Sequence, residues 1–354
     1  MRRILCLTHF LLSIPFIWCG NAAAQSAQTG YASSDTGEID SLYIMPLNDL
    51  ISARLYLSEK ITSMELRDNQ EFRVLSYLPN TSLNLGVGAT VKSVTLNLAY
   101  GFNFLNPDEG QGKTRYLDLQ SHIYTRKLVI DFFGQFYKGM YLENTIDLNP
   151  DFPKPYYVRP DIYEQILGLT GYYVFNNKKY SYRSALIQNE RQLKSAGSLL
   201  AGIEAYYGFV NADSALVPGF LKNIAFQEME GYERLSFLKA GPSIGYTYTL
   251  VIAKKYFAMA SLTLNYGIGF NKAYNPESGT LSDFQGDFGS FGRFGLGYND
   301  TNWYLGITGV ANVIATSTDS RLLNTDYSIT NVRLNFVKRF KPGPKLIPWF
   351  NKVP

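Results

Sequence analysis

The sequence predicts an all-β fold, a transmembrane antiparallel up-and-down β-barrel of 12–14 strands behind an N-terminal signal peptide. Three observations predict it: hydrophobic alternation at period two along most of the chain, an aromatic content of 15%, and no apolar run of helix length after the first twenty residues. A membrane helix needs about 20 apolar residues. A closed barrel is the other structure that satisfies every backbone polar group in lipid.

Residues 1–24 have the three parts of a secretory signal peptide. Two arginines at the start precede an apolar stretch from Ile4 to Trp18, and the small residues Ala22 to Ala24 form a cleavage site. We therefore expect export and cleavage near Ala24. Lipidation at Cys19 is the alternative, but a lipoprotein signal has a small residue before that cysteine, where this chain has the bulky Trp18.

The chain without this leader has a composition that excludes several classes of protein. Both cysteines lie in the leader, and 31 basic residues balance 29 acidic ones. We expect no disulfide, no nucleic-acid partner, no cofactor and no metal. His122 is the only histidine left, which excludes most histidine-based catalysis.

The sequence divides into a leader, a barrel and two flanking segments. Residues 25–44 begin with a stretch rich in Ser, Gly, Ala, Thr and Asp, which predicts a flexible N-terminal segment. Residues 45–340 carry the strand pattern. Residues 341–354 form a Pro-rich tail, which is either loose or docks Trp349 and Phe350 at the barrel mouth.

Strand alternation is clearest where large apolar residues alternate with small or polar ones. Leu262, Leu264 and Tyr266 alternate with Ser261, Thr263 and Asn265. A soluble sandwich would pack the apolar face inward, whereas a membrane barrel turns it to lipid and lines the lumen with the polar face. The long apolar faces, and aromatic residues gathered near strand ends, favour the barrel.

Thirteen strands are expected from this pattern. They lie near residues 51–66, 71–89, 93–104, 114–124, 128–141, 162–175, 180–189, 197–209, 236–251, 256–270, 286–298, 302–314 and 326–340. Bacterial barrels have even strand counts. A further strand near Ala215–Phe226 would give fourteen, and merging two strands would give twelve. Pro242 should lie at a bulge or a strand start, because it cannot donate a ladder hydrogen bond.

Short turns and long loops alternate along the chain, as they do in membrane barrels. Short turns are expected at residues 89–93, 125–127, 176–179, 252–255 and 299–302. Longer loops are expected at residues 106–113, 143–160, 271–283 and 315–324. The short turns would face the periplasm and the long loops the exterior.

His122 is the one residue for which the pattern suggests a mechanism. The hairpin at residues 125–127 would bring it beside Asp131, and the preceding hairpin would bring Thr95 or Asn97 to its other side. This arrangement is compatible with a barrel-borne hydrolase, in which His122 and Asp131 are weak catalytic candidates. A hydrogen-bond network that fills the lumen is the simpler interpretation.

Other polar residues on the inward face are predicted to line the lumen together with His122. They are Arg54, Asn97, Asp118, Asp131, Arg183, Glu204, Arg293 and Arg333. Their mixed charge favours a largely plugged lumen over an open, porin-like channel. The motif G-x-S-x-G at residues 241–245 lacks both the helix and the later histidine that a hydrolase elbow needs.

Several stretches of the chain resemble a family of uncharacterised Bacteroidota outer-membrane proteins, domain of unknown function 4421. Among them are NTSLNLGVG at residues 80–88, GKTRYLDLQSHIY at 112–124, FNNKKYSYR at 175–183 and QNERQLKSAGSLL at 188–200. The resemblance covers most of residues 45–340. It implies an outer-membrane barrel and assigns no catalytic or binding residue.

The function expected from the sequence is that of an integral outer-membrane barrel with a binding, channel or structural role. A lipid-acting hydrolase that uses His122 is the alternative, and a secreted soluble β-protein is a third. The partners expected are outer-membrane lipids and lipopolysaccharide, with the barrel assembly machinery during insertion. The sequence names no protein partner and no solute.

Overall fold

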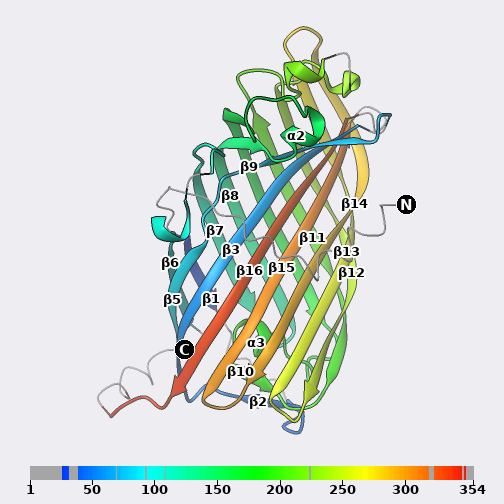
Figure 1. The fold of residues 1–354 in the computed structure, drawn as a ribbon. Helices are drawn as coiled ribbons and strands as arrows, with labels where there is room; N and C mark the ends of the chain where they lie inside the picture. The colour runs from blue at the N-terminus through cyan, green and yellow to red at the C-terminus, as the bar shows by residue number, and fades with distance from the viewer. Residues whose placement is uncertain are drawn as a thin grey trace.

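The structure is a computed structural model that describes residues 26–31, 39–68, 70–91, 94–107, 109–222, 225–318, 323–344 and 347. These residues form a tall, closed barrel of tilted strands (Figure 1). The expected signal peptide lies outside the described residues, and so do Trp349 and Phe350 of the tail. In the described part of the chain, no helix is long and apolar enough to cross a membrane.

Ten strands have ten or more residues and form most of the wall. They are β3 (Ile51–Asp68), β7 (Arg115–Tyr124), β8 (Leu128–Leu142), β9 (Tyr157–Val174), β11 (Ala196–Asn211), β12 (Arg234–Ile252), β13 (Tyr256–Asn275), β14 (Gly279–Asn299), β15 (Trp303–Thr318) and β16 (Leu323–Phe340). Four shorter strands complete the sheet: β1 (Ser26–Tyr31), β4 (Arg73–Leu78), β5 (Asn84–Val91) and β6 (Val94–Tyr100).

The remaining elements are short and lie in the connections. Strands β2 (Ile44–Pro46) and β10 (Glu190–Gln192) form a separate two-stranded sheet. The helices are α2 (Thr145–Leu148), α3 (Tyr182–Leu186), η1 (Asn103–Leu105), η2 (Gly219–Leu221) and η3 (Gln227–Met229).

The fourteen-stranded sheet closes through antiparallel pairing of β16 with β3. One sector of the wall is irregular. Strand β3 pairs with β5 along its first half and with β4 along its second half, so the single strand expected over residues 71–89 is two strands separated by a break. Strand β1 lies between β6 and β7, antiparallel to the first and parallel to the second. Strand β1 lies within residues 25–44, for which the sequence predicts a flexible segment. Part of that segment is therefore a strand of the sheet.

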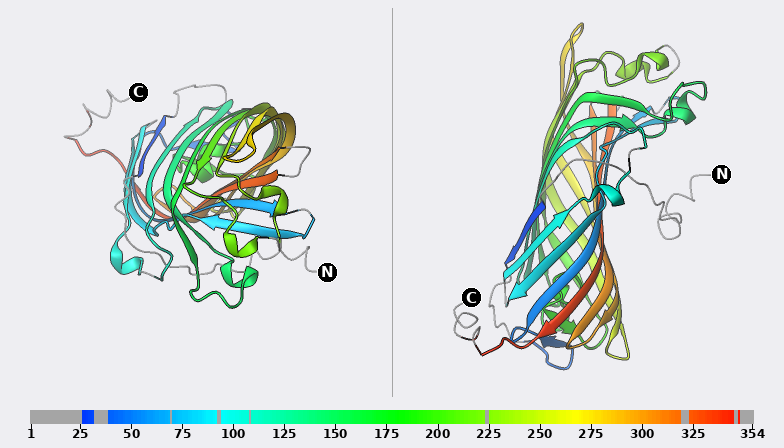
Figure 2. Two further views of the ribbon diagram at one scale, coloured as in Figure 1. Left: turned by 90° about the horizontal axis from the view of Figure 1, so that it is seen from above. Right: turned by 60° about the vertical axis from the view of Figure 1, so that its left-hand side comes forward.

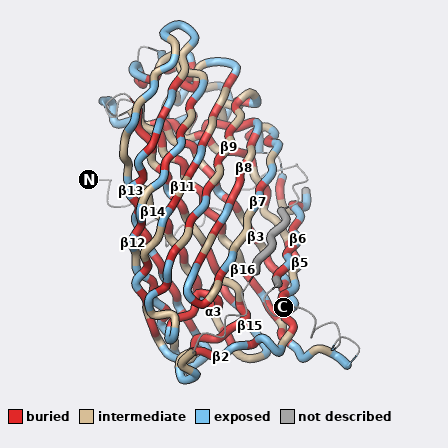
Figure 3. Tube along the Cα trace, turned by 180° about the vertical axis from the view of Figure 1, so that it is seen from behind, coloured by how far each residue is buried: buried red, intermediate tan, exposed pale blue. Residues whose placement is uncertain are grey.

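The two faces of the wall have the polarity expected of a barrel in lipid. Along β13, exposed and buried residues alternate without a break from Tyr256 to Ala273. The exposed ones include Leu262 and Leu264, and the buried ones include Thr263 and Asn265. Apolar side chains point outward and polar ones inward, the reverse of a soluble β-sandwich. Figure 3 shows the same alternation of buried and exposed residues along the other long strands.

At the end where β16 finishes, which we call the lower end, the connections are short except for the long segment between β9 and β11. At the opposite, upper end they are mostly longer (Figure 1). Two expected loops are largely strand. Residues 271–283 continue β13 to Asn275 and start β14 at Gly279, so this hairpin stands above the rest of the rim. Residues 315–324 continue β15 to Thr318 and start β16 at Leu323. Pro242 lies in the middle of β12, and the pairing with β13 is interrupted at residues 241–242, where the proline has no N–H to donate.

Two expected strands are wrong. Residues 180–189 contain helix α3 rather than a strand, and residues 215–226 contain η2 and coil. The count of fourteen is therefore reached through the short strands β1 and β4, and not through a strand near residues 215–226. Both segments pack inside the barrel. The strands on either side of them, β9 with β11 and β11 with β12, already pair with each other and leave no free edge.

Candidate binding site inside the barrel

A segment between β9 and β11, residues 176–195, folds back into the lower end of the barrel, and we call it the plug. It carries α3 and β10, and Figure 1 shows both inside the lower end. Ser181 is the N-terminal capping residue of α3, and its side chain accepts a hydrogen bond from the Ser184 N–H. Strand β10 pairs with β2, so the segment that precedes the first long strand helps to close this end.

Glu190 is the centre of the contacts that hold the plug. Its carboxylate forms buried ion pairs with Arg126 of the β7–β8 turn and, at 3.4 Å, with Arg183 of α3. It also accepts a hydrogen bond of 2.5 Å from the Ser181 hydroxyl. Burial lowers the pKa of the Arg183 guanidinium, and the negative charge of Glu190 opposes that shift. One carboxylate therefore pairs with two buried cations, which leaves this group of three side chains with a net charge of +1.

Two more arginines join the plug to the short turns of the lower end. Arg191 donates hydrogen bonds to the carbonyls of Lys254 and Asn299 at 2.9 and 3.1 Å. Arg339, near the end of β16, donates to the Gln188 carbonyl at 2.7 Å. The plug is thus bound to three separate parts of the barrel wall.

The upper half of the interior is filled differently, by an apolar cluster that we call the upper cluster. Its wall members include Met64, Tyr77, Ile162 and Tyr327. The loop between β11 and β12, residues 212–233, which we call the cap, contributes further buried residues, Leu216, Val217, Leu221, Ala225, Phe226 and Met229. Figure 2, viewed from above, shows loops and short helices gathered over part of this end.

The cap is anchored by polar contacts at its edges. The Tyr77 hydroxyl donates to the Leu216 carbonyl at 2.6 Å, and Arg159 donates to the Ala215 carbonyl at 2.8 Å. Asp68 accepts a hydrogen bond of 2.5 Å from the Phe226 N–H. These bonds satisfy backbone groups that the loop would otherwise bury without partners.

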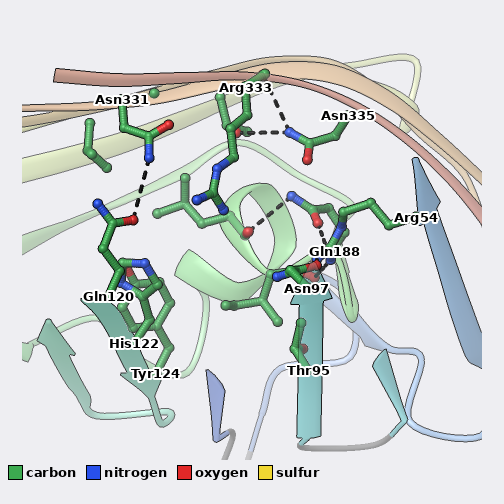
Figure 4. A pocket seen from close by; sticks show the side chains of 15 residues that line it. Arg54, Thr95, Asn97, Gln120, His122, Tyr124, Gln188, Asn331, Arg333 and Asn335 are labelled. Atoms are coloured by element: carbon green, nitrogen blue, oxygen red, sulfur yellow. Dashed lines mark hydrogen bonds between the residues drawn. The ribbon is translucent and has the colours of Figure 1, made fainter. Parts of the chain in front are cut away.

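A polar pocket lies between the upper cluster and the plug, as the order of residues along β16 shows. Tyr327 and Ile329 belong to the upper cluster, Asn331, Arg333 and Asn335 line the pocket, and Arg339 binds the plug. The pocket has a volume of about 80 Å³. Its other lining residues come from β3, β6, β7, β15 and the plug: Arg54, Thr95, Asn97, Gln120, His122, Tyr124, Leu186, Ile187, Gln188, Thr308, Gly309 and Val310 (Figure 4).

The structure brings His122 and Asp131 together across the β7–β8 hairpin. The imidazole Nδ1 lies 2.5 Å from an oxygen of Asp131, and the Tyr124 hydroxyl donates to the same oxygen at 2.7 Å. Arg293 donates to the other oxygen at 2.5 Å, and its guanidinium lies 3.8 Å from the centre of the Phe291 ring. The Asp131 carboxylate is therefore shared among three partners behind the pocket wall.

Thr95 and Asn97 of β6 line the pocket, but the expectation that a hairpin places them directly beside His122 is wrong, because β1 lies between β6 and β7. Asn97 accepts a hydrogen bond of 2.8 Å from Arg54, and the Thr95 hydroxyl lies 2.9 Å from that of Thr90. Strand β1 runs beside these positions, with Gly30 in register with both Thr95 and His122. The hydroxyl of Thr95 is thus engaged by a neighbouring strand and not aligned as a nucleophile by the imidazole.

The other lumen residues expected from the sequence occupy different networks. Asp118 pairs with Lys60 at 2.6 Å, higher in the barrel. Glu204 accepts hydrogen bonds from the hydroxyls of Tyr172 and Tyr206 at 2.7 and 2.6 Å. Arg183 belongs to the plug and not to a strand face, because residues 180–189 form no strand. Only Asn97, His122, Arg333 and Arg54 of the expected set line the pocket.

Sequence reasoning missed Gln188, Arg126 and Glu190, which position the plug beside the pocket. The sequence contained one signal for this segment: it has charged residues at 183, 190, 191 and 194, around the polar Gln188. So many charged residues close together are unusual in a membrane strand. Among the described residues, no group of three or more His, Cys, Asp or Glu could hold a metal ion.

Comparison with known families assigns the chain to one family. The family described as domain of unknown function (DUF4421) matches residues 38–340, and the chain belongs to it. No curated protein sequence matches significantly.

The chain also has a distant similarity to solved outer-membrane proteins. The outer-membrane protease OmpT from Escherichia coli is 12% identical with a TM-score of 0.38, over 84% of this chain and 98% of that one. The toluene transporter TodX from Pseudomonas putida is 8% identical with a TM-score of 0.23, over 92% and 97%. A Pseudomonas aeruginosa FadL homologue is 9% identical with a TM-score of 0.20, over 83% and 90%. These scores carry no argument about activity or ligand.

Proposed function

We propose that the protein is an integral outer-membrane β-barrel that binds a small molecule inside a largely plugged lumen. The observation that carries this proposal is the layering of the interior, with a pocket lined mostly by polar residues between the upper cluster and the plug. Small-molecule sites are usually concave, preformed and lined by a few convergent polar groups. A pore would need a continuous water-filled path, which two filled layers oppose.

Planar-bilayer conductance tests the closed lumen. The wild-type barrel is expected to show no steady ion conductance. Excising only the plug should leave the upper cluster in place and conductance low, whereas excising plug and cap together should open the lumen. A short turn can replace the plug, because the two ends of the segment lie close together. The Asn176 side chain donates a hydrogen bond to the Gly197 carbonyl at 2.8 Å.

Heat-modifiable gel mobility controls for folding of each excised variant. A steady wild-type conductance of porin size would contradict the closed lumen. So would equal conductance of wild-type protein and the doubly excised barrel.

The alternative is a hydrolase that acts on lipids through His122. The His122–Asp131 contact supports it, but Asp131 is also held by Arg293, and Thr95 is bonded to Thr90. Catalytic groups need a nucleophile within hydrogen-bond reach of the base. Any esterase activity of the purified barrel that disappears in His122→Ala, while folding is unchanged, would favour this alternative over binding alone.

The same proposal includes export of the protein and its location in the outer membrane. Cleavage near Ala24, insertion by the barrel assembly machinery and contact with lipopolysaccharide follow from an outer-membrane barrel with an N-terminal signal. A source in Bacteroidota, which the sequence resemblance implies, stays a prediction. Membrane fractionation with mass measurement of the mature N-terminus tests location and cleavage together.

A further inference from the structure

Three positively charged side chains lie together on the outer surface of the wall, at the upper ends of β7 and β8. Arg115 is the first residue of β7, and Lys138 lies directly opposite it in the antiparallel pairing with β8. Lys113 precedes Arg115 by two residues and passes close to β8, because a Cβ atom on Gly139 would come within 2.4 Å of the Lys113 carbonyl. All three side chains are exposed. We call Lys113, Arg115 and Lys138 the cationic patch.

The cationic patch marks the upper limit of the apolar outer surface on these two strands, which lie side by side in the wall (Figure 1). Below Arg115, the outward residues Leu117 and Leu119 are exposed, whereas Asp118 between them is buried. Phe132 of β8 is exposed on the same surface. In a membrane barrel the outward apolar band meets the lipid chains and is bounded by the head-group regions. The three cations therefore lie at the level of the lipid head groups.

The protein does not neutralise this charge. Among the described residues, no carboxylate forms an ion pair with a side chain of the cationic patch. The neighbouring strand β9 places Tyr163 beside Lys138, and the acid two residues away, Asp161, is held by Arg159 at 2.7 and 2.8 Å. Like charges directly opposite each other in a sheet are destabilising. The pair of Arg115 and Lys138 is therefore favourable only beside an anion.

Other exposed cations of the barrel have carboxylate partners. These pairs are Arg67 with Glu65 at 2.6 Å, Lys222 with Glu230 at 3.2 Å and Lys255 with Asp300 at 3.2 Å. The cationic patch differs from them because it gathers three positive charges without an acid. This difference indicates a partner outside the protein.

The amount of charge and its position narrow the class of partner. A phosphate monoester carries a charge of about −1.5 to −2 at neutral pH, so a head group with two of them carries roughly −3 to −4. That charge matches three cations better than the single charge of a phosphodiester lipid. A guanidinium binds phosphate oxygens through paired hydrogen bonds, and the lysines add mobile point charges.

We propose that the cationic patch binds the phosphorylated sugar head of lipopolysaccharide, with its acyl chains along Leu117, Leu119 and Phe132. This inference rests on the outer-membrane location in the proposed function and does not depend on the pocket in the lumen. It assigns the contact with lipopolysaccharide to one place on the wall.

Native mass spectrometry of the folded, full-length mature barrel in detergent tests the proposal, with bisphosphorylated lipid A as the probe. Wild-type protein should retain lipid A. The triple variant Lys113→Gln, Arg115→Gln, Lys138→Gln should bind it roughly a hundredfold more weakly, because each basic residue beside an anionic lipid surface strengthens binding several-fold.

A matched control removes three charges from the opposite end of the barrel. The variant Lys127→Gln, Lys254→Gln, Lys341→Gln replaces exposed lysines near the lower end and should bind lipid A as wild-type protein does. A second variant, Lys113→Arg, Arg115→Lys, Lys138→Arg, keeps all three charges and should retain most of the binding. Gel mobility of the unheated protein establishes that each variant is folded.

Three outcomes would overturn the proposal: no retained lipid A, equal affinity of wild-type protein and the glutamine variant of the patch, or equal binding of lipid A with and without its phosphates. Retention of phosphatidylglycerol as tightly as lipid A would overturn lipopolysaccharide in favour of any anionic lipid. Recovery of the protein in a soluble fraction would overturn the outer-membrane location itself. Loss of lipid A binding in a barrel that fractionates with the outer membrane would overturn this site alone.

Discussion

The two halves of the barrel interior are closed in different ways. The upper half holds an apolar cluster completed by the cap, in which Leu216 and Phe226 are almost fully buried. The lower half holds the plug, whose Tyr180, Tyr182 and Ala185 belong to a second apolar cluster. Its Glu190 makes buried polar contacts with Arg126, Arg183 and Ser181. The pocket lies where these two kinds of packing meet.

The difference matters for how each closure can fail. An apolar cluster loses stability gradually as contacts are removed, because each buried methylene contributes separately. A buried ionic network depends on every member, because removing one partner leaves the others charged and unpaired. The lower closure should therefore be the more sensitive to single substitutions that change charge.

Glu190→Gln should have the largest effect. It leaves Arg126 and Arg183 buried without a carboxylate, and breaking such a network costs about 3–5 kcal/mol. Unfolding by guanidinium chloride in lipid vesicles measures the change in the free energy of unfolding. Glu230→Gln is the control, since Glu230 lies in an exposed pair with Lys222, and should cost less than about 1 kcal/mol. An equal loss of unfolding free energy in the two variants would contradict the prediction that the buried Glu190 contributes more than the exposed Glu230.

Leu216→Ala should have a smaller effect in the upper half. Leu216 is 1% exposed, and its side chain packs into the upper cluster from the cap. The expected loss is about 2–3 kcal/mol, near the lower end for buried leucine, because a loop can relax into part of the cavity. The same unfolding measurement checks it, and a loss as large as that of Glu190→Gln would contradict the proposed ranking.

Glu164→Leu should have the smallest effect, with the opposite sign. Glu164 is fully buried on β9, and neither of its carboxylate oxygens has a hydrogen-bond partner among the described residues. Its neighbours on the same face, Ile162 and Ile166, belong to the upper cluster. Replacing an unsatisfied group by an apolar one should stabilise the barrel by about 1 kcal/mol. Clear destabilisation would show that Glu164 has a role that apolar packing does not describe.

The wall of the barrel could be predicted from the sequence because lipid and lumen impose opposite demands on successive residues. The alternation of Leu262, Thr263 and Leu264 fixes which face each residue occupies. The predictions failed for residues 180–189, where Tyr180 and Tyr182 also alternate with polar neighbours. Both tyrosines are buried inside the barrel and hydrogen-bond to wall hydroxyls, those of Thr247 and Ser261. Inside a closed lumen no lipid face exists, so period two no longer distinguishes a strand from a plug.

The pocket could be predicted only in part. The hairpin register places His122 opposite Asp131, and turn length alone is enough to expect this. Contacts such as Arg54 with Gln188 join residues 134 positions apart. They depend on where the plug docks, and no local pattern encodes that position.

Cysteine accessibility tests the closed interior most directly, because both native cysteines lie within residues 1–24 and the mature chain should have none. Single cysteines would replace Thr247, beside the plug, and Ile166, in the upper cluster, with Glu277 in the β13–β14 turn as the exposed control. A membrane-impermeant, charged thiol reagent should label the Glu277→Cys variant and leave the other two unlabelled until the barrel is denatured. Rapid labelling of Thr247→Cys or Ile166→Cys in the folded barrel would contradict a lumen closed in both halves.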